Sequence, residues 1–396
     1  MIGNLRDSVE KDAAIRRVQR LQPAGGPGDK IFPPTYPGDG TNAPPRHVSE
    51  IRRIEGQNVE CVLIDSVQSQ ANRLEEALLA ASSEGLIELP MIAVDFADTA
   101  VGDIGRITSL EAPHRIFDAI IRDAELEGVP FRESAPGRRL QEAKMQNATA
   151  VLELSPSALV FGAWNSTGEG GGLGAKFPRC IVSEITGVGA ILGKRTSSRI
   201  DPLGIRRDVS VYRKPDGDWT LDKTEAGTNA KALRPSEINH SNIMPSVDAL
   251  GVTIDYAVHS AVVSLAGLRR LSFPDGDGVV TQERDQAGRT LLAALALVSL
   301  AKQDSIGYAL RSRCDLVPER TASYEIVRSD GSTESIPLEL GDAVKALKEA
   351  IGDAEQRDFV WSPEPLILRP QGRLVELVQR SRERALEGAE GAVDGG

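Results

Sequence analysis

The pattern of apolar and polar positions predicts regular structure from about residue 58 onward. Asn58–Ile64 (NVECVLI) is rich in β-branched residues and predicts a buried strand. Asp65 or Ser66 can cap the helix that follows, in which apolar residues at helical spacing predict one buried face: Val67, Ala71, Leu74 and Leu78. The opposite face is rich in hydrogen-bonding side chains, namely Ser66, Gln68, Ser69, Asn72 and Arg73.

The rest of the chain alternates between helical and extended patterns. Helices are predicted over 113–126, 138–150, 283–302 and 341–355, and strands over 158–164, 180–185 and 252–264. Hairpins are predicted over 208–222 and 321–340, with turns at Pro215-Asp216-Gly217 and Asp330-Gly331. Helices, strands and hairpins are mixed without a regular βαβ order, which predicts the α+β class.

The two ends of the chain differ from this ordered middle. A short, charged, helix-like start leads into residues 22–46, which are dense in Pro and Gly and predict no regular structure. This segment is either a disordered linker or an extended arm on a surface; the apolar residues Ile31, Phe32 and Tyr36 favour the arm. Residues 386–396 have little apolar content and are expected to form a disordered tail.

The charge of the chain is unevenly distributed. With 46 Lys and Arg against 57 Asp and Glu, the net charge is −11, which argues weakly against a general polyanion binder. Residues 176–214, however, carry a local excess of six positive charges, and residues 84–127 an excess of seven negative charges. Within the basic segment, Lys194, Arg195 and Arg199 bracket Thr196, Ser197 and Ser198, which suits phosphate oxygens. The alternative is a solvated basic loop.

A glycine-rich loop over 168–174 is the most conspicuous motif. A phosphate-binding P-loop requires Lys and then Ser or Thr directly after its last Gly, whereas here Ala175-Lys176-Phe177 follow Gly174. A nucleotide-hydrolysing site is therefore disfavoured. Two interpretations remain: a mobile loop beside a polyanion, with Thr167, Lys176 and Arg179 as donors, or a flexible surface loop.

The sequence offers no recognisable catalytic constellation. The four histidines are scattered, with no HExxH or GxSxG spacing. His114 beside Arg115 suits either a phosphate contact or a structural role, and Trp164 either base stacking or the core. Asp65 or Asp201 suits a metal-dependent nuclease, but neither has companion carboxylates at ligand spacing. We expect no catalytic residue, metal ion or cofactor.

The location of the protein is also indicated by its composition. Three cysteines lie far apart without a CxxC pair, so neither structural zinc nor a disulfide framework is predicted, and a reducing cytoplasm fits. The N-terminal residues contain no apolar signal-peptide core. The most apolar run, Leu291–Ala301, is about half the length of a membrane span. We expect a soluble cytoplasmic protein without membrane contact.

Several blocks of sequence resemble a known family. KIFPPTYPG, LIDSVQSQANRLEEAL, SLEAPHRIFDAIIRD, LVFGAWNSTGEGGGLGAKFPR and GKRTSSRIDPLGI occur in this order. They are similar to the backbone subunit of type I-G (formerly I-U) CRISPR effector complexes, in the RAMP superfamily. The resemblance runs from about Lys30 to the second hairpin.

The resemblance implies an RRM-like (ferredoxin-like) palm with large insertions that form thumb and finger elements. Three segments are then expected: an N-terminal arm over 1–50, one elaborated RAMP domain over 51–385 with a basic loop and hairpin inserted at about 165–240, and the tail. The region Tyr212–Leu221 is the expected thumb. Residues 58–82 would be the first palm strand and helix, and their polar side chains would face the RNA.

The resemblance also implies the function and partners. Copies of such a subunit polymerise along a CRISPR RNA, hold its backbone and support pairing of the guide with a target DNA strand, beside other effector subunits. The expected RNA-binding residues are the five on the 66–73 helix together with His114, Arg115, Trp164, Thr167, Lys176, Arg179, Lys194, Arg195, Thr196, Ser197, Ser198 and Arg199. Backbone subunits of type I systems are not nucleases. Relatives in type III systems cut RNA with an Asp, so a metal-dependent endoribonuclease is the alternative.

Overall fold

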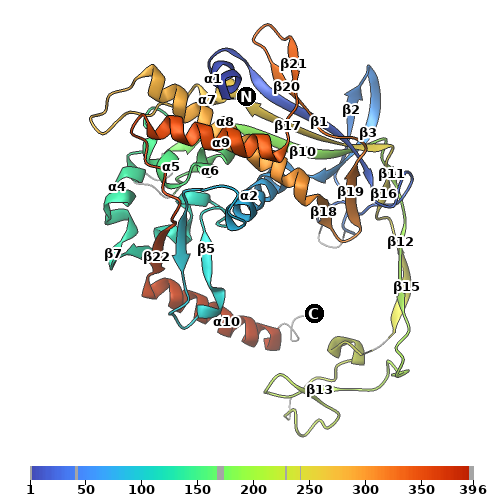
Figure 1. Ribbon diagram of the computed structural model, residues 1–396. Coiled ribbons are helices and arrows are strands. Elements are labelled where there is room, and N and C mark those ends of the chain that lie inside the picture. Colours follow the sequence, from blue (N-terminus) through green and yellow to red (C-terminus); the bar gives the residue numbers. More distant parts are fainter. Residues whose placement is uncertain (1, 41–42, 167–173, 228–229, 241, 392–396) are drawn as a thin grey trace.

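The protein is an antiparallel sheet covered by helices, with a smaller sheet beside it and a long projection (Figure 1). The structure is a computed structural model that describes residues 2–40, 43–166, 174–227, 230–240 and 242–391. The large sheet has nine strands in the order β18-β19-β1-β17-β10-β3-β2, and β20 pairs with both β1 and β21. Its strands are β1 (Ala14–Pro23), β2 (Ser49–Ile54), β3 (Gln57–Asp65), β10 (Ile181–Val188), β17 (Tyr256–Ser264), β18 (Tyr308–Arg311), β19 (Cys314–Pro318), β20 (Ser323–Val327) and β21 (Thr333–Ile336).

The centre of this sheet has RRM-like topology. Along the chain the elements run β1, α2 (Val67–Ser83), β10, β17, α8 (Gln282–Ile306) and β19, which is the βαββαβ order of a ferredoxin-like unit. In the sheet the four strands lie in the order β19-β1-β17-β10, all antiparallel. The predicted α+β class with an RRM-like fold and insertions is therefore confirmed.

One assignment within that fold is wrong. The first strand of the palm is β1, not the strand at 58–65, which is β3 and lies at the far side of β10. Residues 14–23 therefore belong to the centre of the sheet rather than to an N-terminal arm. The inward positions of β1 include Arg17 and Gln19, so its sequence lacks the apolar alternation that marks a strand.

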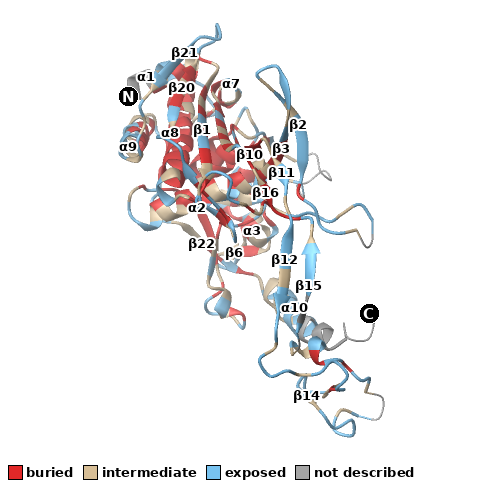
Figure 2. Cartoon of the chain, turned by 90° about the vertical axis from the view of Figure 1, so that its right-hand side faces the viewer, coloured by how far each residue is buried: buried red, intermediate tan, exposed pale blue. Residues whose placement is uncertain are grey.

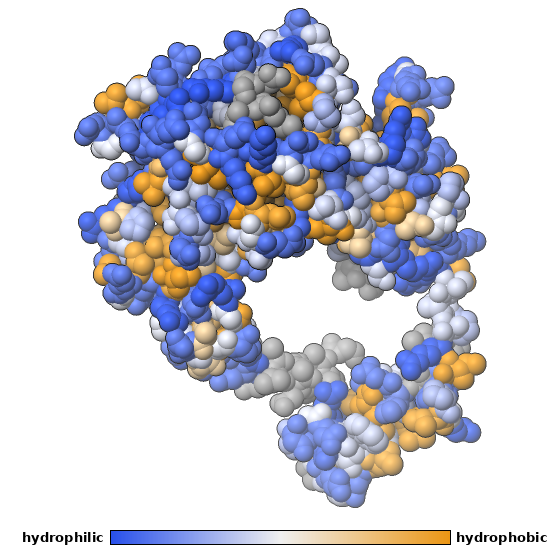
Figure 3. Space-filling model, in the orientation of Figure 1, coloured by the Kyte–Doolittle hydropathy of each residue, from blue (hydrophilic) through white to orange (hydrophobic). Residues whose placement is uncertain are grey.

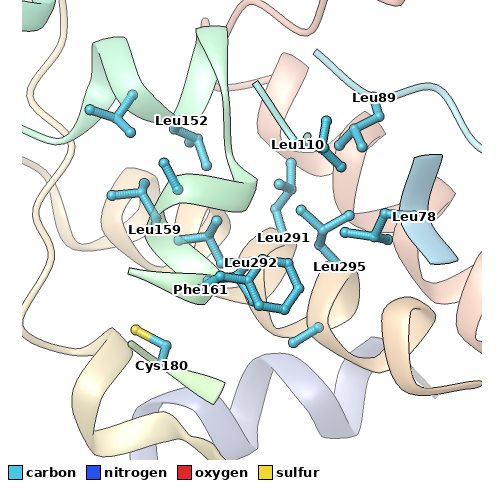
Figure 4. Close-up of a cluster of buried hydrophobic side chains, with 14 of the residues drawn as sticks. Leu78, Leu89, Leu110, Leu152, Leu159, Phe161, Cys180, Leu291, Leu292 and Leu295 are labelled. Carbon is cyan, nitrogen blue, oxygen red and sulfur yellow. The ribbon is translucent and has the colours of Figure 1, made fainter. Parts of the chain in front are cut away.

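Helices α2 and α8 cover one face of the sheet. The main apolar core surrounds α8 and includes residues from α2, from the strands beneath and from the neighbouring helices. Helix α8 is buried along nearly its whole length because α1 (Ile2–Lys11), α2 and α9 (Leu340–Glu355) surround it. Figure 4 shows Leu291, Leu292 and Leu295 of α8 against Leu78 of α2 and Phe161. The burial map of Figure 2 places this apolar mass in the body of the molecule. The predicted helices at 283–302 and 341–355 are confirmed.

A second sheet of five short strands lies beside the palm in the order β5-β4-β22-β6-β7. Its strands are β4 (Ile92–Asp95), β5 (Arg106–Thr108), β6 (Ala124–Leu126), β7 (Val129–Pro130) and β22 (Leu366–Pro370). Short helices lie near this sheet: η1 (Gly102–Ile104), η2 (Arg115–Phe117), α3 (Ala119–Arg122), η3 (Phe131–Glu133), α4 (Ala135–Gln141) and α5 (Thr149–Leu154). Two further short helices pack on the palm: α6 (Ser157–Phe161) on α8 and β10, and α7 (Leu265–Leu268) on α1, α8 and β1. Helix α10 (Gly372–Gly391) includes residues 386–391 of the expected tail, and 392–396 lie outside the described residues.

Three predicted elements in this part are wrong. The single helix expected over 113–126 is divided into η2, α3 and β6, because Asp118 is extended between η2 and α3, with φ of −66° and ψ of 151°. The helix expected over 138–150 is divided between α4 and α5. The strand expected over 158–164 is helix α6, and only its last two residues form the short strand β8 (Ala163–Trp164), which pairs with β9 (Lys176–Phe177).

A long two-stranded projection leaves the palm at its right-hand side in Figure 1. We call its ribbon, β12 (Arg195–Arg199) paired with β15 (Ile243–Asp248), the stalk, and the described residues at its end, 200–227, 230–240 and 242, the tip. The tip contains β13 (Tyr212–Arg213), β14 (Trp219–Thr220) and η4 (Pro235–Ile238), so the predicted hairpin at 208–222 is confirmed. Figure 3 shows the tip standing away from the palm across a wide opening.

The Pro/Gly-rich segment lies against the palm as an extended arm. We call residues 24–40 and 43–48 the arm; Ile31 is buried and joins the smaller of the two apolar clusters. Of the two interpretations that the sequence leaves open, the surface arm is therefore the observed one. The arm passes the base of the stalk, where β11 (Ile191–Leu192) pairs with β16 (Val252–Thr253).

Candidate nucleic-acid interface

Two adjoining cavities run between α2, the 110–118 segment and the β8–β9 pair. The larger has a volume of about 630 Å³ and the smaller about 420 Å³, and Pro113, Arg115 and Arg179 line both. We call the pair the palm groove. Its walls come from segments that are distant in sequence, since the lining includes Asn72 of α2 and Arg270 after α7.

Four cationic side chains line the larger cavity: Arg115, Lys176, Arg179 and Arg270. None of the described residues that line it is a carboxylate. Glu75, Glu76 and Glu111 line the adjoining smaller cavity, so the excess of positive charge is confined to the larger one. An excess of positive charge in a concave surface attracts anions and concentrates them there. The arrangement suits phosphate groups.

Arg115 is held in place by the side chain of Glu75 on α2. Its Nε and Nη2 atoms donate to the two carboxylate oxygens, both at 2.7 Å, and Nη1 donates to the carbonyl of Gly162 at 3.1 Å. Burial raises the pKa of Glu75 to about 7, although Arg115 and Arg179 oppose this shift. Burial and the charge of Arg115 lower the pKa of Arg179. Two guanidinium groups therefore share one carboxylate, which leaves the cluster positive.

Trp164 and Lys176 form the outer wall of the larger cavity. They are directly opposite on β8 and β9, and the Lys176 Nζ atom lies 4.3 Å from the centre of the indole ring. Trp164 is 45% exposed, so of the two interpretations it is the surface position that the structure supports. An exposed ring beside free cations can stack on a base while phosphates are held nearby.

The polar face of α2 has two different roles. Ser66 caps the helix by accepting from the amide of Ser69, while Ser69 and Arg73 turn toward Asp65. Asp65 is completely buried and also accepts from Gln70 Nε2 at 2.7 Å and Arg311 Nη2 at 3.1 Å. Only Gln68 and Asn72, of the five residues proposed from sequence on this helix, line the palm groove.

The remaining proposed residues divide between the groove and the stalk. His114 is exposed and lines the larger cavity. Thr167 lies outside the described residues. On β12, Arg195 pairs with Asp248 at 2.9 Å and Ser197 Oγ lies 2.7 Å from Ser246 Oγ. The other residues of this set, which are Lys194, Thr196, Ser198 and Arg199, are exposed.

Sequence reasoning did not identify two residues of the groove. Arg270 follows the end of β17 by six residues, and nothing in LAGLRRL distinguishes it from a solvated charge. Glu75 falls on the helical face next to Asn72, but its pairing with Arg115 depends on the irregular 113–118 segment. The signal in the sequence that could have identified Glu75 was an acidic residue beside the apolar face of α2.

The carboxylates considered for a nuclease are not arranged for metal binding. The oxygens of Asp65 already accept from Ser69, Gln70, Arg73 and Arg311. Oδ1 of Asp201 accepts from the amide of Leu203. Among the described residues there is no group of three His, Cys, Asp or Glu side chains placed to hold a metal ion. Within the same residues, no helix combines the length and apolar character of a membrane span.

Comparison with known proteins supports a CRISPR-associated protein. Residues 15–191 match the model of the family described as CRISPR-associated protein GSU0053 (Cas_GSU0053). No curated protein matches the chain. The matched range begins at β1 and ends at the base of the stalk, so it includes α2, the 110–118 segment and the β8–β9 pair of the groove.

Proposed function

We propose that this chain is a non-catalytic, guide-RNA-binding backbone subunit of a CRISPR effector complex. The observation that carries the proposal is the larger cavity of the palm groove, where four cations meet without a lining carboxylate. The family match over 15–191 supports a CRISPR-associated role for a chain with this groove.

The chemistry of the groove suits RNA held by its backbone. Arg115, Arg179 and Arg270 present guanidinium donors to phosphates, and the amide side chains of Gln68 and Asn72 suit phosphate or 2′-hydroxyl oxygens. Such contacts carry no sequence information. Sequence is then read by pairing between guide and target, while the protein holds the shape of the strand.

The stalk and tip supply a second, exposed surface for the same strand. Lys194, Arg195 and Arg199 lie on β12 or directly before it, and Thr196 and Ser198 alternate with them. The partners of the proposed subunit are the CRISPR RNA, a target DNA strand reached through the guide, further copies of the chain and the other effector subunits. Its proposed location is the cytoplasm.

The test is RNA binding by the groove as a function of salt concentration. We expect the double variant R179A/R270A to bind a guide-length RNA about 10-fold more weakly and to lower the salt slope by about 1.4, because two phosphate contacts to a single strand are lost. Fluorescence anisotropy at several salt concentrations measures both quantities. The double variant R138A/K345A, which removes two exposed cations that line neither cavity, is the matched control and should leave both unchanged.

Two results would contradict the proposal. Wild-type protein that binds no RNA at low salt would remove the function. Equal losses in R179A/R270A and in R138A/K345A would show that binding follows overall charge rather than the groove. Incubation with guide-matched RNA and Mg²⁺ tests the non-catalytic part, since RNA fragments would indicate the endoribonuclease instead.

A further inference from the structure

The place where the stalk joins the palm is built from two glycines. We call residues 191–194 and 250–253 the stalk root. The amide of Gly193 donates to the carbonyl of Gly251 at 2.7 Å, and Gly251 has φ of +80°, a conformation that other residues rarely adopt. A two-stranded ribbon that continues from such a joint has little stiffness of its own.

The arm contacts the stalk root on both strands. Ile31 and Val252 exchange two backbone hydrogen bonds of 2.9 Å, and the Ile31 side chain is only 2% exposed. Lys30 reaches the other strand, where its Nζ atom donates to the carbonyl of Lys194 at 2.8 Å. The arm therefore ties together the two strands from which the stalk grows.

His47 adds a third contact from the far end of the arm. The Gly251 amide donates to His47 Nε2 at 2.8 Å, and His47 Nδ1 lies 3.1 Å from the carbonyl of Pro34. Because a carbonyl only accepts, the proton must be on Nδ1, which leaves Nε2 free to accept. The ring thus connects Pro34, in the middle of the arm, to the glycine at which the stalk begins.

Side chains of the arm pack closely against both glycines of this joint. A Cβ atom on Gly251 would lie 2.8 Å from Cδ of Lys30 and 2.9 Å from Cζ of Phe32. A Cβ atom on Gly193 would lie 3.0 Å from Cε of Lys30. The close fit means that the arm limits movement of the root.

We propose that the Pro/Gly-rich arm is a splint that sets the direction of the stalk relative to the palm, with His47 and Ile31 as its positioning residues. Prolines suit this role because their fixed φ reduces the freedom of the free arm. One consequence rests on the proposed function: in an RNA-binding subunit, the splint would set the length of RNA that runs between the palm groove and the stalk.

The splint is tested first without RNA, by the distance between palm and tip. The three native cysteines are buried, so spin labels are placed at the exposed positions Glu349→Cys on α9 and Lys223→Cys in the tip. We expect one narrow distance distribution by double electron–electron resonance. His47→Ala and Gly251→Ala should each broaden it at least twofold, while His47→Gln, which offers an acceptor and a donor, should restore it.

The matched control is Arg46→Ala. Arg46 directly precedes His47, and this change removes only its exposed ion pair with Asp39. Its distribution should stay as narrow as in the wild type. Thermal melting checks that each variant folds, and if His47→Ala fails to fold, Lys30→Met replaces it, because this side chain reaches the stalk root from the surface. Distributions that stay narrow in both Gly251→Ala and the arm variant would overturn the splint.

A nuclease footprint on bound guide-length RNA tests the consequence for spacing. We expect wild type and Arg46→Ala to protect a fragment of defined length, and His47→Ala to protect fragments of several lengths. A broadened distance with an unchanged footprint would overturn the link to RNA spacing while the splint stands. Absence of RNA binding in the wild type would remove the proposed function and leave the distance result unaffected.

Discussion

The palm groove and the stalk both carry clustered cations, but the two regions hold them differently. In the groove, Arg115 is only 11% exposed and its guanidinium makes three hydrogen bonds to Glu75 and Gly162. On the stalk, Arg195 is 46% exposed and has one ion pair, with Asp248 on the neighbouring strand. The groove is thus a preorganised site, whereas the stalk presents side chains that adapt.

This difference matters for what each region contributes to binding. A preorganised donor loses little conformational entropy when it meets a phosphate, so it defines where the strand lies. An exposed Arg that must leave its carboxylate partner contributes less and is screened more by salt. We therefore expect the groove to determine the position of the RNA and the stalk to extend the contact.

The largest effect on the free energy of unfolding should come from removing the buried carboxylate of Asp65. Asp65→Ala leaves Arg73, Arg311 and Gln70 without their shared acceptor, and we expect the free energy of unfolding to fall by about 3–5 kcal/mol. Asp248→Ala, which breaks the exposed pair on the stalk, should cost about 1 kcal/mol or less. Urea unfolding measures both, and equal losses would contradict the contrast between the regions.

The next effect concerns the contribution of the stalk to RNA binding. Replacing Arg195 and Arg199 together by Glu should weaken binding of guide-length RNA about 10-fold and reduce the salt slope by about 1.4. The free energy of unfolding should fall by about 1 kcal/mol or less, because both side chains are exposed and only the pair of Arg195 with Asp248 is replaced by a repulsion. An unchanged affinity would remove the stalk from the interface while leaving the groove assignment intact.

A smaller, pH-dependent effect is expected from Glu75. Its pKa in the folded protein, about 7, lies above the ordinary value of 4.5, so the folded state binds more protons than the unfolded state between these values and stability falls as pH rises through this range. Deprotonation also places a negative charge on Glu75, which lowers the net positive charge of the groove by one. RNA affinity should therefore drop by roughly two- to fivefold as the pH rises from one unit below to one unit above this pKa.

The control for this pH effect is Glu75→Gln, which cannot ionise. Its affinity should vary less with pH over the same range than that of the wild type, because all other titrating groups are the same in the two proteins. Anisotropy titrations at constant ionic strength provide the measurement. A wild-type profile identical to that of Glu75→Gln would show that this carboxylate does not regulate the groove.

The smallest effect should be seen in the tip. Trp219 is 43% exposed and contacts the edge of His240, so Trp219→Ala should change the free energy of unfolding by about 0.5 kcal/mol or less. Phe161→Ala in the main core should cost about 3–5 kcal/mol. A large loss from Trp219→Ala would indicate that the tip is coupled to the palm core, contrary to the comparison of the two regions.

The sequence predicted the elements whose patterns are local. The periodicity of α8 and α9 and the turn residues of the two hairpins were sufficient to place them. Strand β1 was missed because Arg17 and Gln19 occupy inward positions, where the two terminal guanidinium nitrogens of Arg17 contact the buried His259 and the carboxylate of Asp304. A sequence pattern predicts that a polar residue is exposed, because its burial requires a hydrogen-bond partner that the pattern does not identify.

The same distinction separates the two parts of the candidate site. The sequence by itself determined that positive charge gathers between 176 and 214, and that α2 has one polar face, because both are properties of adjacent residues. Only the tertiary structure decided that Asp65 takes Ser69 and Arg73 away from that face, and that Arg270 joins Arg115 and Arg179 in one cavity. Hydrogen bonds and charge pairs act over a few ångströms in space. Their partners can be far apart in the sequence, as Asp65 and Arg311 are, with a separation of 246 residues, so the pattern of neighbouring residues does not show which side chains meet.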